Sequence, residues 1–390
     1  MAEIKKLSEV VEILNGYAFE SKKYVEAGLR IIRIANVQDG VIVDNLPCFY
    51  PVNTDVNIEK YKLFENDLLL SLTGNVGRVG ILPVHMLPAV LNQRVCCLRP
   101  KSQNVSYKYL YYYLLRRCFV EDCIKASKGV AQLNLSTKWL ANYPIYIPNI
   151  SKQEHIISRI EELFSQLDTS VAELKTAKER LRVYRQAVLK EAFEKVKVHI
   201  PFGKIIDARL GKMLDKEKNT GNYRKYLRNI NVRWFSFDLS DLLEMRIEDD
   251  EIEKYSVSHN DLIICEGGEP GRCAVWDKHD SIFYQKALHR VRFLDNSNPK
   301  FYMYYLWFSA QTGQLCRYFT GTGIKHLTGQ SLSKVVVPKT DRPTQDSIVA
   351  EIESRLSVCD SIEKTVETAL LQAKALQQSI MKKAFEGRLL

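Results

Sequence analysis

Apolar residues recur at every third or fourth position over two long segments of the chain, Ser151 to Lys195 and Thr344 to Gly387. Neither segment contains a proline, and Gly387 is the first glycine in either of them. This spacing predicts two long helices with one apolar stripe each, with Ser151 and Thr344 as N-caps and Gly387 as the C-terminal stop. The predicted seam residues are Ile156, Ile160, Leu163, Leu167, Leu174, Leu181, Val188, Ile348, Ile352, Leu356, Ile362, Val366, Leu376 and Ile380.

A long helix with a single apolar stripe buries that stripe only against a partner. The first predicted helix carries the chain away from one globular segment and the second follows the other. We therefore expect the two helices to pair as an antiparallel coiled coil. Two alternatives stay open at this point: each helix packs on its own globular segment, or helices from two copies of the chain pair in parallel.

The two globular segments have the alternating pattern of short strands and turns. Apolar runs of strand length, such as DLLLSLT from Asp67 and DLIICE from Asp261, are separated by glycine, asparagine and proline. One helix is expected near the end of each segment, over 107–126 and from Phe301. The fold class is therefore α+β, with two similar strand-rich domains joined by two long helices and a pseudo-two-fold internal repeat.

The internal repeat is visible directly in the sequence. NDLLLSLTGNVGR, from Asn66, resembles NDLIICEGGEPGR, from Asn260, and RIANV, from Arg33, resembles RNINV, from Arg228. SKGVAQLN, from Ser127, occupies the position of GTGIKHLT in the second half. A repeat of this length indicates duplication of a whole domain with its helix rather than a solenoid.

Charge and cysteine content narrow the class of protein. The chain of 390 residues has a formal net charge of +10, which favours an anionic partner, and nucleic acid is the commonest one. Nine cysteines without CxxC spacing argue against a metal site and fit a reducing cytoplasm. The N-terminus is not that of a signal peptide, and no apolar run is long enough to predict a membrane span.

The motifs of common enzymes are missing. GNVGRVG lacks dinucleotide-binding spacing, no phosphate-binding GKS or GKT motif occurs, and HExxH and GxSxG are absent. Asp67 and Asp261 are interpreted as turn residues rather than catalytic carboxylates. We predict no catalytic and no metal-ligating residues in this chain.

Polar residues in the repeated loops are instead suited to binding DNA. Glycine permits close approach of the backbone, and arginine, lysine and glutamine contact phosphates and base edges. The candidate DNA-binding residues are Arg33, Thr73, Asn75, Arg78, Gln93, Arg94, Lys128, Gln132, Arg228, Asn231, Glu269, Arg272, Gln285, Lys286, Lys325 and His326.

The order of these motifs resembles the specificity subunit of Type I restriction–modification enzymes. The resemblance covers essentially the whole chain and includes the glycine loop, SKGVAQLNLSTKWLANYPIYIP and the helix entry QEHIISRIEELFSQLD, which recur as GTGIKHLTGQSLSKVVVP and TQDSIVAEIESRLSVCD. It implies a target recognition domain over 1–150, a spacer helix over 151–196, a second such domain over 197–342 and a second spacer helix over 343–390.

The resemblance also implies function and partners. Each domain would read one half of a bipartite site on double-stranded DNA, and the coiled coil would fix the gap and dock two methyltransferase subunits. Restriction subunits would join the larger complex. S-adenosylmethionine, ATP and Mg are expected on those partners and no cofactor on this chain. The alternatives are a coiled-coil scaffold without sequence-specific DNA readout and an enzyme with an unrecognised site.

Overall fold

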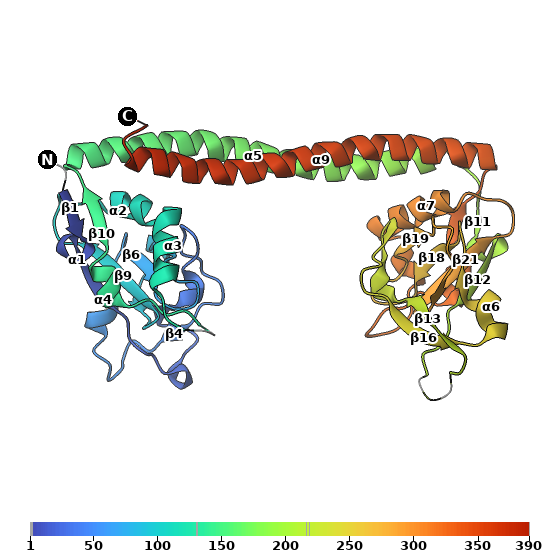
Figure 1. Ribbon diagram of the computed structural model, residues 1–390, viewed down its shortest axis with the longest axis horizontal. Helices are drawn as coiled ribbons and strands as arrows, with labels where there is room; N and C mark the ends of the chain where they lie inside the picture. Colours follow the sequence, from blue (N-terminus) through green and yellow to red (C-terminus); the bar gives the residue numbers. More distant parts are fainter. Residues whose placement is uncertain (1–2, 130–131, 216, 218, 390) are drawn as a thin grey trace. The chain divides into compact units, whose positions relative to one another are not determined.

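The computed structural model describes residues 3–129, 132–215, 217 and 219–389 (Figure 1). Val130 and Ala131, which belong to the predicted loop from Ser127, lie outside the described residues. The chain forms two compact units. Unit 1 comprises Met1–Leu174 and Thr368–Leu390, and unit 2 comprises Lys175–Glu367.

A four-stranded antiparallel sheet forms the centre of the globular part of unit 1. Its apolar strands are buried on both faces: Leu68 and Leu70 contribute to one core cluster, and Leu69 contributes to another. Burial on both faces explains why this strand reads as an unbroken apolar run. In spatial order the strands are β2 (Val11–Asn15), β9 (Val95–Pro100), β6 (Leu68–Ser71) and β7 (Val79–Ile81).

A second sheet and several short elements complete this globular part. The second sheet is, in order, β4 (Phe49–Tyr50), β3 (Leu29–Ile32), β8 (Ala89–Leu91) and β5 (Lys62–Leu63), with β3 and β8 parallel. The remaining strands and helices are β1 (Glu3–Lys6), which pairs with β10 (Pro144–Ile147), and α1 (Leu7–Val10), α2 (Tyr107–Leu114), α3 (Arg117–Ala126) and α4 (Thr137–Ala141).

The single helix expected over 107–126 is wrong, because the helix is interrupted between α2 and α3. Arg116 is extended there, with a ψ of 141°. Its Nε donates to the carbonyl of Tyr113 at 2.8 Å, and its guanidinium lies 3.5 Å from the centre of the Tyr113 ring. Arg116 therefore satisfies an open carbonyl at the end of α2 and stops the helix.

Unit 2 repeats both four-stranded sheets in the same strand order, which confirms the predicted internal repeat. Ile263 and Leu262 again point into two different core clusters. The first sheet is β12 (Ile206–Leu210), β21 (Leu288–Phe293), β18 (Leu262–Cys265) and β19 (Cys273–Val275), and the second is β16 (Leu243–Ile247), β13 (Asn222–Leu227), β20 (Ile282–Tyr284) and β17 (Ser256–Val257). The other elements are β11 (His199–Pro201) with β22 (Val336–Pro338), β14 (Val232–Arg233) with β15 (Ser236–Phe237), α6 (Ile252–Tyr255), α7 (Pro299–Gln311) and α8 (Gly329–Lys334).

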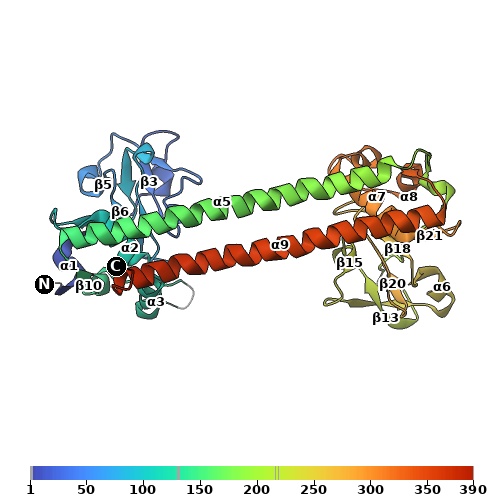
Figure 2. The same cartoon turned by 90° about the horizontal axis from the view of Figure 1, so that it is seen from above.

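The two long helices are α5 (Ile150–Glu194) and α9 (Arg342–Phe385), and Figure 2 shows them side by side. Both start earlier than predicted. The side chain of Asn149 accepts from the amide of Lys152 at 2.9 Å, and Asp341 accepts from Thr344 at 3.3 Å. Asn149 and Asp341 are therefore the N-caps, and the predicted caps Ser151 and Thr344 lie inside the helices. Gly387 has a φ of 73° and ends α9 as predicted.

Ion pairs within unit 2 show that α5 and α9 run antiparallel. Lys178 pairs with Glu367 at 2.6 Å, and Lys195 pairs with Glu351 at 2.7 Å, so positions rise along one helix as they fall along the other. In unit 1, Ile380 and Ala384 of α9 share a core cluster with Ile160 of α5. The predicted antiparallel coiled coil is confirmed.

The seam of α9 follows a strict seven-residue repeat. Ile352, Cys359, Val366, Ala373 and Ile380 are all buried. A second set, offset by four residues, contains Leu356, Glu363, Leu370, Gln377 and Ala384. A heptad of this kind is the packing pattern of coiled coils.

Two predicted seam residues of α9 are wrong. Ile362 is 44% exposed and Leu376 is 49% exposed. Each stands one residue before a core position that a polar residue occupies, namely Glu363 and Gln377. The apolar pattern alone therefore placed the stripe one residue too early at both points.

The seam of α5 also follows a heptad. Ile160, Leu167, Leu174, Leu181 and Val188 recur at seven-residue spacing, and none of them is exposed. Ile156 is buried and Leu163 packs beside it, both against the core of the globular part of unit 1. Within the described residues, no helix is sufficiently long and apolar to cross a membrane.

Candidate DNA-binding loops

Four segments of unit 1 converge where β6 ends and β9 begins. Thr73 Oγ1 donates to Asn134 Oδ1 at 2.9 Å, and the amide of Gly74 donates to Leu133 O at 2.8 Å. The amide of Leu72 in turn donates to the carbonyl of the turn after β8. We call this group the first loop cluster; its segments are the 3₁₀ turn η2 (Ile34–Asn36) and the loops 72–78, 92–94 and 127–134.

The same four segments converge in unit 2. Asn229 Nδ2 donates to the carbonyl of Gly267, and the amide of Leu327 donates to Glu266 O at 2.7 Å. Gly267 also forms a bridge with His326. This second loop cluster consists of the 3₁₀ turn η6 (Asn229–Asn231) and the loops 266–272, 285–287 and 320–328.

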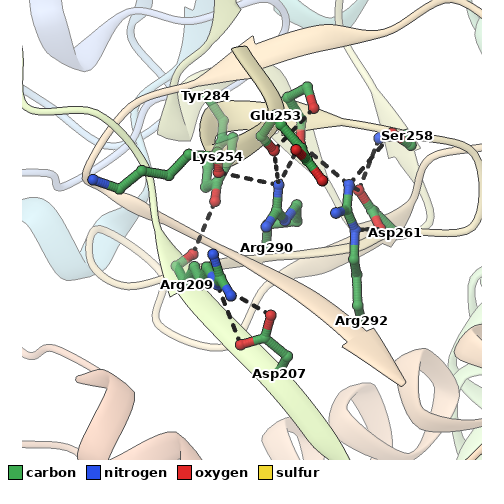
Figure 3. Close-up of polar contacts among 10 residues, drawn as sticks. Asp207, Arg209, Glu253, Lys254, Ser258, Asp261, Tyr284, Arg290 and Arg292 are labelled. Carbon is green, nitrogen blue, oxygen red and sulfur yellow. Dashed lines mark hydrogen bonds and ion pairs between the residues drawn. The ribbon is translucent and has the colours of Figure 1, made fainter. Parts of the chain in front are cut away.

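The repeated Asn-Asp pairs lie at the opposite end of β6 and β18 and are structural. Asn66 has a left-handed φ of 65°, and the buried carboxylate of Asp67 accepts from Arg99 Nε at 2.7 Å and Nη2 at 2.6 Å. Figure 3 shows the equivalent pair, Asp261 and Arg292, at 2.7 and 2.9 Å. The hydrogen bonds to Asp261 raise the pKa of Arg292 above its ordinary value. The interpretation of these aspartates as turn residues is confirmed.

The Gly-Arg pairs also hold the protein together. Arg78 Nη1 donates to Gln38 Oε1 at 2.8 Å and Nε pairs with Asp39 at 3.1 Å. Arg272 is only 14% exposed; its Nη1 donates to Glu269 at 2.8 Å and its Nη2 donates to Asn229 at 3.0 Å. Arg78 therefore ties the loop after β6 to the segment that follows η2, and Arg272 ties the loop after β18 to η6.

Three further candidates are held within unit 2. Arg228 Nη2 donates to Asp241 Oδ2 at 2.7 Å, and Glu269 accepts from Trp234 Nε1 and from Arg272. Asn231 is 2% exposed, and its side chain bonds the backbone of Arg228, Asp238 and Asp241. A buried amide with these partners does not reach a base, so the assignment of Asn231 to the DNA-binding set is corrected.

Arg33 has the same position in unit 1 as Arg228 in unit 2. Its Nη2 donates to the carbonyl of Leu46 at 2.9 Å, while its backbone amide bonds Asn36 Oδ1. Arg33 therefore also supports the first loop cluster from within.

The remaining candidates project from the clusters. Gln93, Arg94 and Lys286 are exposed and Gln285 is half-buried, and none of the four side chains makes a polar contact among the residues that the structure describes. Their backbone is fixed: the amide of Gln93 donates to Tyr17 O at 3.1 Å, and that of Lys286 donates to Lys212 O at 3.0 Å. Long polar side chains on an anchored turn are the arrangement that direct base readout requires.

The other loops project polar groups as well. Asn75, Lys128 and Gln132 are exposed in the first cluster. In the second, Lys325 Nζ donates to Gly321 O at 2.8 Å, and His326 is half-buried beside Gly267.

Sequence reasoning missed two buried residues that hold the second loop cluster in place. Lys212 is 5% exposed and its ammonium pairs with both Glu248 and Glu251. Buried His289 donates from Nε2 to Leu327 O at 2.8 Å, and burial lowers the pKa of this imidazole. Neither has a counterpart of the same type in the first half, so the repeat offered no signal for them.

Buried Arg290 was missed for the same reason. Its Nη1 donates to three carbonyls, of Glu253, Lys254 and Ser256, at 3.3, 3.1 and 2.6 Å (Figure 3). Burial lowers the pKa of this guanidinium, which lies over the Tyr284 ring. Arg290 thereby fixes the chain entering β17. No cluster of metal-ligating residues occurs in the described part of the chain.

The comparisons with known proteins agree with this geometry. Residues 2–179 match the family model described as Type I restriction modification DNA specificity domain. The specificity subunit of the EcoBI enzyme of Escherichia coli is 24% identical over 98% of this chain and 85% of its own length. That of the EcoKI enzyme of E. coli K12 is 24% identical over 99% and 89%.

The chain is similar over nearly its whole length to the specificity subunits of Type I restriction–modification enzymes. Solved structures share its fold. A chain from a study of complex assembly and conformational transition of the type I R-M system matches with a TM-score of 0.78, 15% identity and coverage of 99% of this chain and 98% of that one. The HsdS subunit from Thermoanaerobacter tengcongensis matches with a TM-score of 0.58 at 15% identity, over 99% and 97%.

Proposed function

We propose that this chain is the non-catalytic DNA-reading subunit of a Type I restriction–modification complex, and that each loop cluster reads one half of a split site. The observation that carries the proposal is that two equivalent clusters present different side chains on the same frame. The turn after β8 offers Gln93 and Arg94, and the turn after β20 offers Gln285 and Lys286. Two domains with the same backbone arrangement but different exposed side chains would recognise two different DNA sequences.

The chemistry of these side chains supports distinct roles. Arginine and glutamine form paired hydrogen bonds with guanine and adenine, while lysine acts as a point charge toward phosphate. We assign base contact to Gln93, Arg94 and Gln285 and phosphate contact to Lys128 and Lys286. Phosphate contact makes binding weaken as salt rises.

The domain division proposed is 1–150 and 197–342 for the DNA-binding domains and 151–196 and 343–390 for the spacer helices. We further propose that the spacers fix the gap between half-sites and dock two methyltransferase subunits, with restriction subunits joining the complex in the cytoplasm. Exposed apolar side chains on the helices support docking: Val183 is 61% exposed and Val358 is 58% exposed.

The first experiment is to map adenine methylation across the source genome by single-molecule sequencing, with and without this gene. Loss of methylation at one split motif is the expected result. An unchanged methylation pattern, in cells where the methyltransferase is expressed, contradicts the proposed function.

Variants then assign each half-site. Replacing Gln93 and Arg94 with alanine should relax only one half of the motif, because each lost base contact costs about 1–3 kcal/mol. Replacing Gln285 and Lys286 should affect only the other half. Lys60, an exposed lysine outside the loop clusters, provides the charge-matched control. Equal relaxation of both halves by either pair would contradict the assignment.

A further inference from the structure

Unit 1 contains a hollow of 510 Å³ between its globular part and α9. Its walls combine apolar and cationic side chains. We call it the α9 hollow; the lining residues that matter here are Arg78, Leu115, Arg117, Leu371, Lys374 and Gln378. All of them belong to unit 1, and the backbone amide of Arg117 donates to Gln378 Oε1 at 3.1 Å.

The equivalent region of unit 2 shows which kind of side chain can pack against this wall. Gly40, which contacts Leu115, is the equivalent of Phe235. Both have a left-handed φ, 84° and 70°, and both donate their amide to the next strand: Gly40 to Val79 O at 3.0 Å and Phe235 to Cys273 O at 3.2 Å. A Cβ at Gly40 would lie 3.1 Å from the Tyr111 hydroxyl and 3.5 Å from Leu115.

Phe235 places an aromatic ring in unit 2 at the position where unit 1 has Gly40. Its ring lies 4.8 Å from Trp307, at 90°, and 5.3 Å from Tyr304. Trp307 stands two residues after Tyr305 in α7, as Leu115 stands two residues after Tyr113 of α2. Both tyrosines contact a phenylalanine of a long helix edge to face.

The backbone of Phe235 is unfavourable for its residue type. A left-handed φ costs an aromatic residue about 1–2 kcal/mol, so the contacts of its ring must offset that strain. The Phe235 ring contacts Trp307 and Tyr304 and remains 37% exposed, and unit 1 carries no ring at the equivalent position, Gly40.

The mouth of the α9 hollow is positively charged. Arg117 is 80% exposed but pairs with Glu121 at 2.8 Å, and Arg78 pairs with Asp39. Exposed Lys374 is the lining cation that makes no ion pair within the described residues. Leu371 is 71% exposed at the same rim. An apolar wall with a cationic rim suits an aromatic side chain that is flanked by carboxylates.

We propose that a methyltransferase subunit inserts an aromatic side chain, flanked by carboxylates, into the α9 hollow. The inference rests on the proposed function, which requires this protein partner. Phe235 performs the same task within unit 2, so the two units dock their partners differently. The first methyltransferase subunit uses the hollow, and the second does not.

The test measures binding of the purified methyltransferase subunit of the same system to the full chain, by surface biosensor and native mass spectrometry. Gly40→Phe closes the hollow in the way that unit 2 does, Leu371→Glu removes the apolar rim and Lys374→Glu reverses its charge. Each is expected to weaken one of two binding events by tenfold or more. Leu371 and Lys374 are exposed, so their variants test the inference even if Gly40→Phe folds poorly.

Arg182→Glu is the matched control, because Arg182 stands relative to Phe193 on α5 as Lys374 stands relative to Phe385 on α9. It should leave both binding events unchanged. Unchanged affinity in all three hollow variants overturns the inference. An effect of Lys374→Glu alone also overturns it, because binding would then depend on charge and not on an inserted aromatic ring. Failure of the wild-type chain to bind any methyltransferase subunit would remove the proposed function itself.

Discussion

Removing Glu363 from the core of the coiled coil should destabilise unit 2 more than removing any exposed ion pair. Arg185 Nη1 donates to Glu363 at 2.6 Å, and Lys178 lies 3.4 Å from the same carboxylate. Arg185 also pairs with Asp360 and Lys178 with Glu367, each at 2.6 Å. We call these five residues the ionic layer; Lys178, Arg185 and Glu363 stand at core positions of the heptads.

The magnitude follows from burial. Glu363 is 26% and Arg185 20% exposed at the side chain, which places the pair between the exposed and the buried limits. Breaking a buried pair costs about 3–5 kcal/mol, and exposed pairs contribute about 0–1 kcal/mol. Because Arg185 retains Asp360, we expect an interaction energy of about 1–2 kcal/mol between Arg185 and Glu363.

A double-mutant cycle isolates this energy. Arg185→Leu, Glu363→Leu and the double variant are compared by urea unfolding, which does not screen charges as guanidinium does. Three of the four tryptophans belong to unit 2, so a Trp139→Phe background makes fluorescence report that unit alone. Lys195 and Glu351, a more exposed pair at 2.7 Å, provide the control cycle, with an expected energy of about 0.5 kcal/mol.

The sign of the pH dependence gives a second check. The hydrogen bond from Arg185 is the main cause that lowers the pKa of Glu363 in the folded state. A lowered folded pKa means that the stabilisation is complete above the unfolded pKa of about 4.5 and is lost as pH falls through the folded value. An interaction energy no larger than that of the control pair, or one that persists unchanged at acid pH, would refute the reasoning.

Two further outcomes are expected. Asp261→Asn should lower the free energy of unfolding of unit 2 by about 3 kcal/mol, because Arg292 would lose its bidentate carboxylate. The same urea assay measures this loss, and a value below about 1 kcal/mol would contradict the structural role of the turn. Exposed Cys118 and Cys316 should react with a thiol reagent at pH 8 in the native protein, whereas buried Cys265, whose pKa burial raises to about 11, should react only after unfolding; mass mapping of the labelled thiols distinguishes them.

The helices were predictable because their signal is local. Heptad spacing and the lack of breakers lie within one segment, and the structure confirms both long helices and their antiparallel pairing. The first residues of the two helices were not predictable, because the N-caps Asn149 and Asp341 lie just before the periodic stretch. Ile362 was misplaced because an acidic residue, Glu363, fills the core position. Its partners come from α5, which is remote in sequence.

The repeat in sequence predicted the two loop clusters but misled about their chemistry. Arg78 and Arg272 drew attention because both halves share them, yet each is bonded to the 3₁₀ turn or hairpin of its own unit. Arg228 and Asn231 are likewise bonded within the protein. No periodicity reveals such bonds, because they join segments far apart in the chain.

A duplicated domain that recognises two different DNA sequences must keep the residues that hold its backbone in place, the frame, and change the residues that contact DNA. Residues common to both halves are therefore expected to build the frame, as the Asp67 turn and the Arg78 clamp do. Residues that contact DNA are expected where the halves differ on a shared backbone, as Gln93 differs from Lys286 on turns held by equivalent hydrogen bonds. By this reasoning, exchanging Gln93 and Lys286 alone should alter the half-sites while leaving the stability of both units within about 0.5 kcal/mol. A large loss of stability in that exchange would show that these side chains belong to the frame.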